Sequence, residues 1–472
     1  MKLKIVQESN KYTFNEVFDI IGSNESKMES ILKSLISMNI IKRLNNKSNK
    51  LEIQDLVKID LLKNINYEIQ EELYVFKYVG IVIIDQCCLL IYPKYIKNIE
   101  EDVANGYKKF RQILEVIKKY KAKEQNYYIS ENEENVEFNL LPFTIDLLND
   151  YYKNGIYSNN TKIIEYNGFG DVFWEKTINQ QNVYFSKGVP VYLDLYTWNN
   201  KINQEDLCRR IHKCIISTCC EKLEEILKVL NINPIFISTE TLDELGENEY
   251  LIYVIKNELS KQFITKKQFI LNKMIEYINE NNSKKGKVKL SFIGTNQFNL
   301  VWQDVCSVVM ENCLDKTLSE LNLKSYGELN ENSKLREVIP KPGWIHKISK
   351  NEHKAIRTLI PDLINISGKK ISIYDAKYYD IILNNKEVKN QPGIEDIIKQ
   401  YIYELSYKKL ADENGLFIRD NAFLFPSDEK KEQSIGIARF ESFSDYVDGL
   451  NLNDIEVILK PCEEMYKKYL NK

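Results

Sequence analysis

Two short segments near the start of the chain carry apolar residues at helical spacing. In residues 13–22, "TFNEVFDIIG", the apolar side chains share one face, and Gly22 can end the helix. A second helix is predicted within residues 24–41, with Asn24 as its candidate N-cap. The strand-like segments "IKRL" and "LEIQDL" follow, separated by a polar turn. This order predicts a winged-helix-like module over residues 1–66, a type that binds DNA in some proteins and protein in others.

Longer apolar runs, typical of buried strands, begin at Tyr74. "LYVFKYVGIVIID" and "CCLLIYPKYI" predict one hairpin, and "NVYFSKGVPVYLDLYT" predicts another with its turn at Lys187-Gly188. Helical patterns are expected at residues 107–121 and 204–230 and within 241–281. We therefore predict a middle α+β domain over residues 67–284, ending in the polar, basic segment 281–292.

The last part of the chain alternates helices and strands. A helix, "FNLVWQDVCSVVMENCL", precedes the strands "TLIPDLINIS" and "KISIYDAKYYD", which join near Gly368. The helix "IEDIIKQYIYELSYKKLAD", the strands "NAFLFP" and "GIARFES", and a final helix, "DIEVILKPCEEMYKKYL", complete the order. Helices interleaved with strands predict a mixed sheet covered by helices, so the fold class is multidomain α/β.

The composition is that of an ordinary globular protein. The 472 residues are 43% hydrophobic and 28% charged, which is enough chain for two or three domains. A net charge of −3 argues against a uniformly basic nucleic-acid-binding surface but leaves room for a local basic groove. No apolar run approaches the ~18 residues of a membrane span, and the N-terminus has no apolar signal core. We expect a cytoplasmic protein without membrane association, whose nine cysteines are buried thiols.

Three charged residues interrupt the apolar hairpin of residues 359–380. Asp375 and Lys377 are two positions apart on the second strand, so their side chains leave the same face. The turn near Gly368 can bring Asp362, on the first strand, close to Asp375. Two carboxylates and a backbone carbonyl offer hard oxygen ligands that suit Mg²⁺, with Mn²⁺ as an alternative. With a lysine beside them they can hydrolyse a phosphodiester, whereas the simpler interpretation is an exposed Asp–Lys pair on a sheet edge.

The pattern Pro361-Asp362 followed by Asp375-Ala376-Lys377 resembles the PD-(D/E)xK nuclease superfamily. The resemblance implies a restriction-endonuclease-like domain over residues 285–472. It also implies that Asp362 and Asp375 bind the metal and that Lys377 assists the attacking water.

Two neighbouring helices carry further candidates that this resemblance implies. Lys399 and Gln400 lie on the helix after the hairpin, where members of the superfamily have a residue that supports the site or contacts the DNA backbone. Members often have an acid on the first helix of the domain. Gln303 holds the expected register here and Asp304 follows it, so Asp304 is our candidate for the third metal ligand.

A larger part of the chain, from about Leu73 to the C-terminus, resembles the LlaJI-type restriction endonucleases and the related McrC-like nuclease subunits. The segments that carry this resemblance are "YVGIVIIDQCCLLIYPKYI", "GDVFWEKTIN" with "YLDLYT", and "FNLVWQDVC". It implies a bacterial defence enzyme that cuts foreign double-stranded DNA with a separate McrB-like AAA+ GTPase. The chain has no phosphate-binding G-x-x-x-x-G-K-[ST] motif of its own. By the same analogy "GDVFWEKTIN" forms the surface that docks on the partner, although Trp174 is equally well interpreted as a buried aromatic.

Several features keep two interpretations. Lys341, Lys347 and Arg357 precede the first strand of the hairpin and are either phosphate contacts or solvated loop charges. Gln303 in place of an acid favours a catalytically silent DNA-binding or scaffold subunit as the alternative to a nuclease. A winged-helix transcriptional regulator is a second alternative, and homo-oligomerisation is left open.

Overall fold

The computed structural model describes residues 2–22, 25–44, 72–97, 99, 102–125, 138–283, 290–325, 327, 329–440 and 452–472. Residues 136–292 form one compact unit, and residues 2–135 together with 293–472 form the other. The predicted division at residues 66 and 67 therefore does not coincide with a boundary between compact units. No helix of the described residues is both long and apolar enough to cross a membrane.

The C-terminal part of the larger unit is built on a five-stranded mixed sheet in the order β15-β16-β19-β21-β20. The strands are β15 (Leu363–Ser367), β16 (Lys370–Ala376), β19 (Phe417–Ser427), β20 (Gln433–Ala438) and β21 (Ile455–Pro461). β15 and β16 are antiparallel, whereas β19 runs parallel to both β16 and β21. The predicted hairpin is thus present, and its turn uses Gly368 at φ 61°, a left-handed conformation that glycine adopts without strain.

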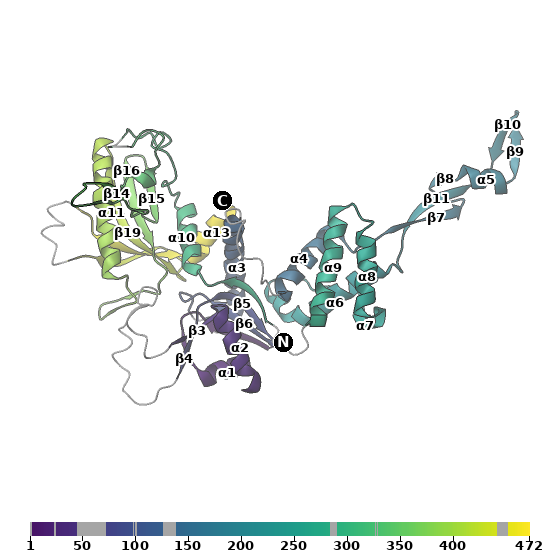
Figure 1. The fold of residues 1–472 in the computed structure, drawn as a ribbon, viewed down its shortest axis with the longest axis horizontal. Helices are drawn as coiled ribbons and strands as arrows, with labels where there is room; N and C mark the ends of the chain where they lie inside the picture. The colour runs from purple at the N-terminus through teal and green to yellow at the C-terminus, as the bar shows by residue number, and fades with distance from the viewer. Residues whose placement is uncertain are drawn as a thin grey trace. The chain divides into compact units, whose positions relative to one another are not determined.

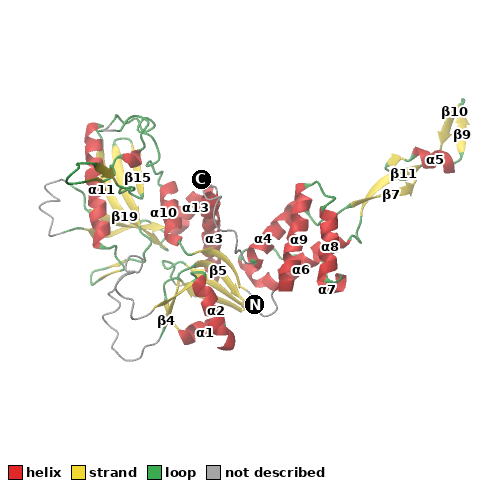
Figure 2. Ribbon diagram, in the orientation of Figure 1, coloured by secondary structure: helices red, strands yellow, loops and turns green. Residues whose placement is uncertain are grey.

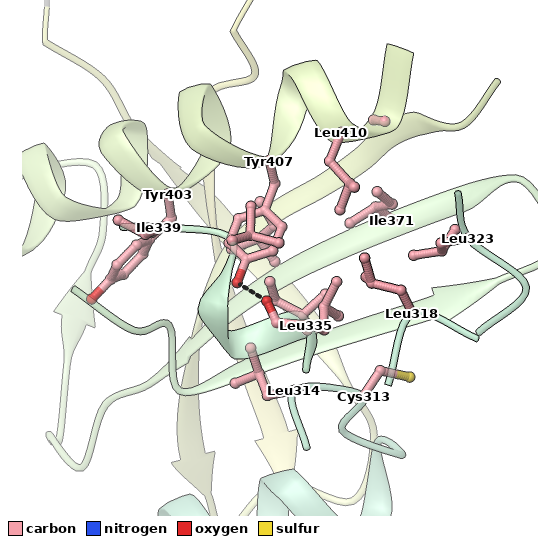
Figure 3. Close-up of a cluster of buried hydrophobic side chains, with 14 residues drawn as sticks. Cys313, Leu314, Leu318, Leu323, Leu335, Ile339, Ile371, Tyr403, Tyr407 and Leu410 are labelled. Atoms are coloured by element: carbon pink, nitrogen blue, oxygen red, sulfur yellow. Dashed lines mark hydrogen bonds between the residues drawn. The ribbon is translucent and has the colours of Figure 1, made fainter. Parts of the chain in front are cut away.

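Helices pack against this sheet (Figure 2). They are α10 (Phe298–Val309), α11 (Ile394–Glu413) and α13 (Cys462–Asn471). Figure 3 shows the cluster in which Tyr403, Tyr407 and Leu410 of α11 lie over Ile371 of β16. The Tyr407 hydroxyl is buried there and donates to the carbonyl of Leu335 at 3.0 Å, so its burial leaves no polar group unsatisfied. This core fixes α11 over the strand that carries Asp375.

The final helix is shorter than its apolar pattern predicts. Residues 455–461 form β21 in place of the first half of that helix, and α13 begins only at Cys462. The segment "IEVIL" is rich in β-branched residues, and parallel pairing with β19 buries it in the sheet. Pro461 then ends the strand directly before α13, a position at which a proline suits the start of a helix.

The N-terminal residues join the same unit through two further sheets. β1 (Lys2–Gln7) runs parallel to β6 (Cys87–Tyr92), and β5 (Val79–Ile84) and β12 (Leu290–Thr295) complete the order β1-β6-β5-β12. Gly80 at φ 142° lies so close to the main chain of Ile293 that any Cβ there would clash with its carbonyl. Helix α3 (Val103–Gln125) contacts α13 and α10. Segments from all three predicted domains therefore share one sheet.

The predicted winged-helix-like module is only partly described. α1 (Phe14–Ile21) begins with a capping box between Thr13 and Glu16 and ends at Gly22, as predicted. α2 (Glu25–Ser37) follows, and a small sheet has the order β2-β4-β3, with β2 (Lys11–Thr13), β3 (Ile41–Leu44) and β4 (Leu73–Phe76). Asn24 and the segment "LEIQDL" lie outside the described residues. The winged-helix assignment stays a prediction.

The smaller unit consists of a helical part and an arm of short strands (Figure 1). The helices are α4 (Leu140–Asn154), α6 (Leu207–Val229), α7 (Leu242–Leu245), α8 (Asn248–Leu259) and α9 (Thr265–Ser283). The arm, residues 160–202, contains β7 (Asn160–Tyr166), β8 (Asp171–Val172), α5 (Trp174–Gln180), β9 (Val183–Ser186), β10 (Val189–Tyr192) and β11 (Tyr196–Ile202). β9 and β10 form the predicted hairpin, with both residues of the Lys187-Gly188 turn at positive φ.

Candidate active site

The register of the β15–β16 hairpin places Asp362 opposite Asp375. Leu363 pairs with Tyr374 and Ile364 with Ile373, so the next position along the two strands is the Asp362–Asp375 pair. Side chains directly opposite each other on antiparallel strands lie about 5 Å apart at Cβ. Asp375 is also on the face of β16 that holds Ile371 and Ile373, which pack under α11. The hairpin therefore brings together the two carboxyl groups that the sequence pattern singled out.

Asp362 is held by donors on both of its oxygens. The Gln303 side chain donates from Nε2 to Oδ1 at 2.7 Å, and the Ala376 main-chain N–H donates to Oδ2 at 3.0 Å. Burial raises the pKa of Asp362 well above its usual range, and the adjacent carboxyl of Asp375 raises it further. Burial and the neighbouring carboxyl thus both disfavour the charged form of Asp362.

Lys377 bridges this pair to α11. Its Nζ lies 2.8 Å from Asp375 Oδ2 and 2.9 Å from Asp396 Oδ1, and its side chain is 16% exposed. Burial by itself would lower the pKa of Lys377, but the two carboxylates outweigh burial and raise it above its ordinary value. The lysine is therefore a fixed ammonium group at neutral pH.

Asp396 was not predicted from the sequence as a site residue. It lies in the first turn of α11, where its carboxylate also accepts the main-chain N–H of Gly393 at 3.2 Å. That contact is an ordinary helix cap, which is the only role its sequence position indicates. The sequence did contain one indication: Asp396 lies four residues before Gln400 and therefore on the same face of a helix that was expected to support the site.

Gln400 and Lys399 do not contact the two carboxylates. Gln400 is fully buried, and its Nε2 donates to the carbonyls of Ala422 at 3.3 Å and Ile373 at 3.5 Å. It thereby ties α11 to β16 and β19 two residues from Asp375, a supporting position. Lys399 is partly buried on α11, and no ion pair joins it to the described carboxylates.

Asp304 does not join Asp362 and Asp375. Its carboxylate forms an ion pair with Lys123 of α3 at 2.8 Å and accepts the Tyr469 hydroxyl of α13. A step of one residue turns a helix by about 100°, so Asp304 cannot share the direction of Gln303. Gln303 occupies the position that faces Asp362, and the expectation that Asp304 completes the site was wrong.

The three predicted phosphate contacts lie on an exposed segment that leads into the site. Lys341, Lys347 and Arg357 are all exposed, and Arg357 precedes Asp362 by five residues. The chain between Arg357 and Asp362 is anchored by Tyr403 of α11, whose hydroxyl donates to the Ile360 carbonyl at 3.1 Å. Burial, followed by the charges of Asp375 and Asp362, raises the pKa of Tyr403 to about 12, so it stays a neutral donor.

The donor set fits a magnesium ion better than zinc. No group of three or more His, Cys, Asp or Glu side chains within the described ranges is arranged to hold a metal. Zinc sites use three or four protein ligands, whereas Mg²⁺ keeps several waters and uses one or two carboxylates. Asp362 and Asp375 supply such carboxylates.

Comparison with known proteins assigns the family. A model of the LlaJI restriction endonucleases matches residues 78–455, which is most of the chain. The chain belongs to the LlaJI restriction endonuclease family. This membership supports a nuclease subunit of a restriction system and confirms the resemblance noted in the sequence.

One curated protein and two solved structures are similar to this chain. The Type II restriction enzyme BsuMI component YdjA of Bacillus subtilis (strain 168) is 29% identical over 421 residues, covering 86% of this chain and 83% of that protein. A solved half-complex of Thermococcus gammatolerans McrB AAA+ hexamers with bound McrC aligns at 13% identity and a TM-score of 0.35, over the whole of both chains. The cryo-EM structure of the Thermococcus gammatolerans McrBC complex aligns at 13% identity and a TM-score of 0.25, over 67% of this chain and 89% of that one.

Proposed function

We propose that this protein is a Mg²⁺-dependent DNA endonuclease subunit of a restriction system, with a PD-(D/E)xK site. The observation that carries the proposal is the opposition of Asp362 and Asp375 across a hairpin, with Lys377 bound to Asp375. Family membership supports the reaction class, hydrolysis of phosphodiester bonds in foreign double-stranded DNA.

Asp362, Asp375 and the Ala376 carbonyl would hold the ion. When bound, Mg²⁺ would supply charge neutralisation at the scissile phosphate and a lowered pKa for water beside it. Asp362 is positioned for this by Gln303 and by the Ala376 N–H, which fix both carboxylate oxygens. Asp375, which already forms an ion pair with Lys377, would contribute to both the ion and the lysine.

Lys377 would orient the attacking water and stabilise the charge that develops on the phosphate. Its ammonium group carries three donors, and the ion pairs with Asp375 and Asp396 direct two of them. The third is then available for a phosphate oxygen or a water. Asp396 acts through Lys377 as a positioning residue, and Gln400 keeps β16 and β19 in register below the site.

The direct test is cleavage of plasmid DNA by the Asp375→Ala protein with Mg²⁺ or Mn²⁺, with and without the candidate partner. We expect the variant to fold and to lose cutting, because one metal ligand and the main partner of Lys377 are gone. Asp412→Ala is the matched control, since Asp412 is an exposed carboxylate on the same helix as Asp396. Cutting retained by Asp375→Ala would defeat the site assignment.

A silent DNA-binding or scaffold subunit is the second candidate function. It is favoured by one contact, the amide of Gln303 at the position facing Asp362, where an acid would add a metal ligand. If the intact protein with its partner binds DNA but cuts none under any divalent cation, this alternative replaces the nuclease. A winged-helix regulator would instead need DNA binding by the intact protein that substitutions within residues 1–66 abolish.

The arm of the smaller unit is the proposed docking surface for an McrB-like AAA+ GTPase. It exposes large apolar side chains that monomeric surfaces seldom gather so densely: Tyr166 56%, Phe169 106%, Trp174 55%, Ile178 55%, Phe185 71%, Val189 60% and Leu193 68%. Trp174 begins α5, and its exposure excludes the buried interpretation. The similar Bacillus subtilis protein is itself described as a component of an enzyme, which agrees with a partner.

Substitutions on the arm test the docking surface. Phe185→Ser and Trp174→Ala should each weaken co-elution with the purified GTPase from the same genome, because apolar anchors dominate such interfaces. Tyr253→Ala, which removes a residue 68% exposed on α8, is the control. Unchanged co-elution of both arm variants would move the partner surface elsewhere.

A further inference from the structure

A small hairpin precedes the first active strand and projects no side chain into a core. β13 (Gly343–Ile345) pairs with β14 (Glu352–Lys354), so that Trp344 lies opposite His353. Its base is closed by Ala355 N–H donating to the Pro342 carbonyl at 2.8 Å. Every residue from Lys341 to Lys354 is exposed. We call residues 341–357 the basic hairpin.

The tip of the basic hairpin is held in one conformation by its own hydrogen bonds. His346 N–H donates to the Asn351 carbonyl at 2.9 Å, and Lys350 N–H donates to the His346 carbonyl at 2.9 Å. The His346 ring accepts the main-chain N–H of Ser349 at 3.2 Å, and Lys350 takes the left-handed conformation at φ 58°. The segment is therefore a preformed shape, which lowers the entropic cost of binding.

Apolar side chains on the basic hairpin face solvent. Trp344 is 72% exposed, Ile345 66%, Ile348 86% and Ile356 89%. Folding gains nothing from four large apolar groups left in water, so their presence on a preformed hairpin indicates a binding surface.

The charges of the basic hairpin identify the class of partner. Its cationic side chains are Lys341, Lys347, Lys350, Lys354 and Arg357, against a single carboxylate, Glu352. None of these cations has an ion pair with the part of the chain that the structure describes, although the whole chain carries a net charge of −3. Local excess positive charge interleaved with apolar groups matches a nucleic acid, whose phosphates flank an apolar stack of bases.

We propose that the basic hairpin enters a groove of double-stranded DNA beside the cleaved bond, with Trp344 and Ile348 against the bases and the cations on the flanking phosphates. The proposal rests on the proposed nuclease function and adds a residue set that reads or deforms the duplex. Apolar side chains pressed between base steps unstack them at an energy that depends on sequence, so the hairpin is a specificity element.

The position of the hairpin in the chain supports a contact close to the cleaved bond. Arg357 is five residues before Asp362, and an extended chain spans at most about 3.5 Å per residue. The end of the hairpin is thus within about 18 Å of the metal ligand, roughly half of a DNA turn. The Thr358 hydroxyl donates to the Pro340 carbonyl at 2.8 Å, and this hydrogen bond holds the two ends of the basic hairpin together.

The test is binding to a mixed-sequence 40-base-pair duplex in the inert Asp375→Ala background, measured as a function of salt. Trp344→Ala should weaken binding about 5- to 100-fold at every salt concentration without changing the salt slope, because it removes base contacts and no charge. Lys347→Ala with Lys350→Ala should reduce the slope of log K against log salt by about 1.8. Ile437→Ala and Lys431→Ala are the apolar and cationic controls, both exposed on another edge of the same domain.

The outcomes separate this inference from the proposed function. If the intact protein cuts DNA and Trp344→Ala binds and cuts as well as the parent, only the role of the hairpin fails. If Trp344→Ala instead loses the GTPase partner and keeps its DNA affinity, the hairpin is a protein-docking surface and the inference is overturned. If the intact protein neither binds nor cuts DNA, the proposed function fails as well. Thermal unfolding that matches the parent protein excludes misfolding of this exposed segment as the cause.

Discussion

Asp362→Asn is expected to stabilise the metal-free protein while it abolishes cutting. Asp362 is buried against Asp375, and burial and that neighbouring carboxyl raise its pKa well above the usual range. Asparagine removes the repulsion, and its amide can donate to Asp375 while its carbonyl accepts the Ala376 N–H. The hydrogen bond from Gln303 to the other oxygen of Asp362 is lost, which reduces the gain. A residue kept for catalysis at the expense of stability should behave in this way.

The size of the effect follows from the geometry. Side chains opposite each other on the hairpin lie about 5 Å apart, and two unit charges at that distance repel by about 3 kcal/mol at an effective dielectric constant of about 20. Lys377, 2.8 Å from Asp375, and Gln303, 2.7 Å from Asp362, offset part of this repulsion. We expect a net gain of about 1–3 kcal/mol for Asp362→Asn at pH 8, enough to raise the melting temperature by about 2 °C or more.

The pH dependence gives the sign. A carboxyl group whose folded-state pKa is raised holds its proton more tightly in the folded protein. The stability lost by ionising Asp362 in the folded protein is therefore absent below pH about 3.8, and it grows as the pH rises toward the raised pKa. The stability gap between Asp362→Asn and the parent should widen across this window and then level off. Magnesium at ten times its dissociation constant should stabilise the parent by about 1.4 kcal/mol and the variant far less.

Scanning calorimetry of both proteins from pH 4 to pH 8, with and without Mg²⁺, measures all three quantities. Asp412→Asn serves as the control, because that exposed carboxylate has no part in the site. A variant that is less stable than the parent at pH 8, or a gap that does not change with pH, would refute the reasoning about crowded charge.

Gln303→Glu adds a carboxylate next to Asp362, so it should lower the Mg²⁺ concentration needed for half-maximal cutting at least several-fold. It should also lower the stability of the metal-free protein. An unchanged Mg²⁺ titration of cutting would contradict this. In the smaller unit, burial, followed by the charge of Arg209, lowers the pKa of His212 to about 4. As the pH falls, His212 takes up a proton in the unfolded chain before it does so in the folded protein. The free energy of unfolding should therefore decrease as the pH drops from 6.5 toward 4, by about 2 kcal/mol at pH 5. Circular dichroism should show less acid sensitivity in His212→Gln, and identical acid profiles would exclude His212 as the cause.

Local patterns were sufficient to predict the hairpin that brings the candidate residues of the site together. Alternation of apolar residues and the glycine turn defined β15 and β16, and a spacing of two placed Asp375 and Lys377 on one face. The helix that carries Gln400 was equally clear. On α10 the register was read correctly, because Gln303 faces Asp362. The preference for an acid at that site pointed instead to Asp304, whose carboxylate pairs with Lys123.

Long-range pairing decided what the local pattern left open. The run "IEVIL" suits a helix or a strand, and its pairing with β19, more than thirty positions earlier, made it a strand. The domain limits depended in the same way on the sheet that joins residues 2–7, 79–92 and 290–295. Asp396 was missed because an acid in the first turn of a helix is accounted for by capping, here of the Gly393 N–H. Nothing in the local pattern pointed to its ion pair with Lys377.

The central claim is that Asp362 and Asp375 share one divalent cation, and a crystal structure with Mn²⁺, recorded at a wavelength that identifies manganese, tests it most directly. The account predicts one anomalous peak within about 2.3 Å of an oxygen of each carboxylate, with Lys377 still bound to Asp375. A protein that cuts DNA with Mn²⁺ yet shows no peak between these two side chains would contradict it.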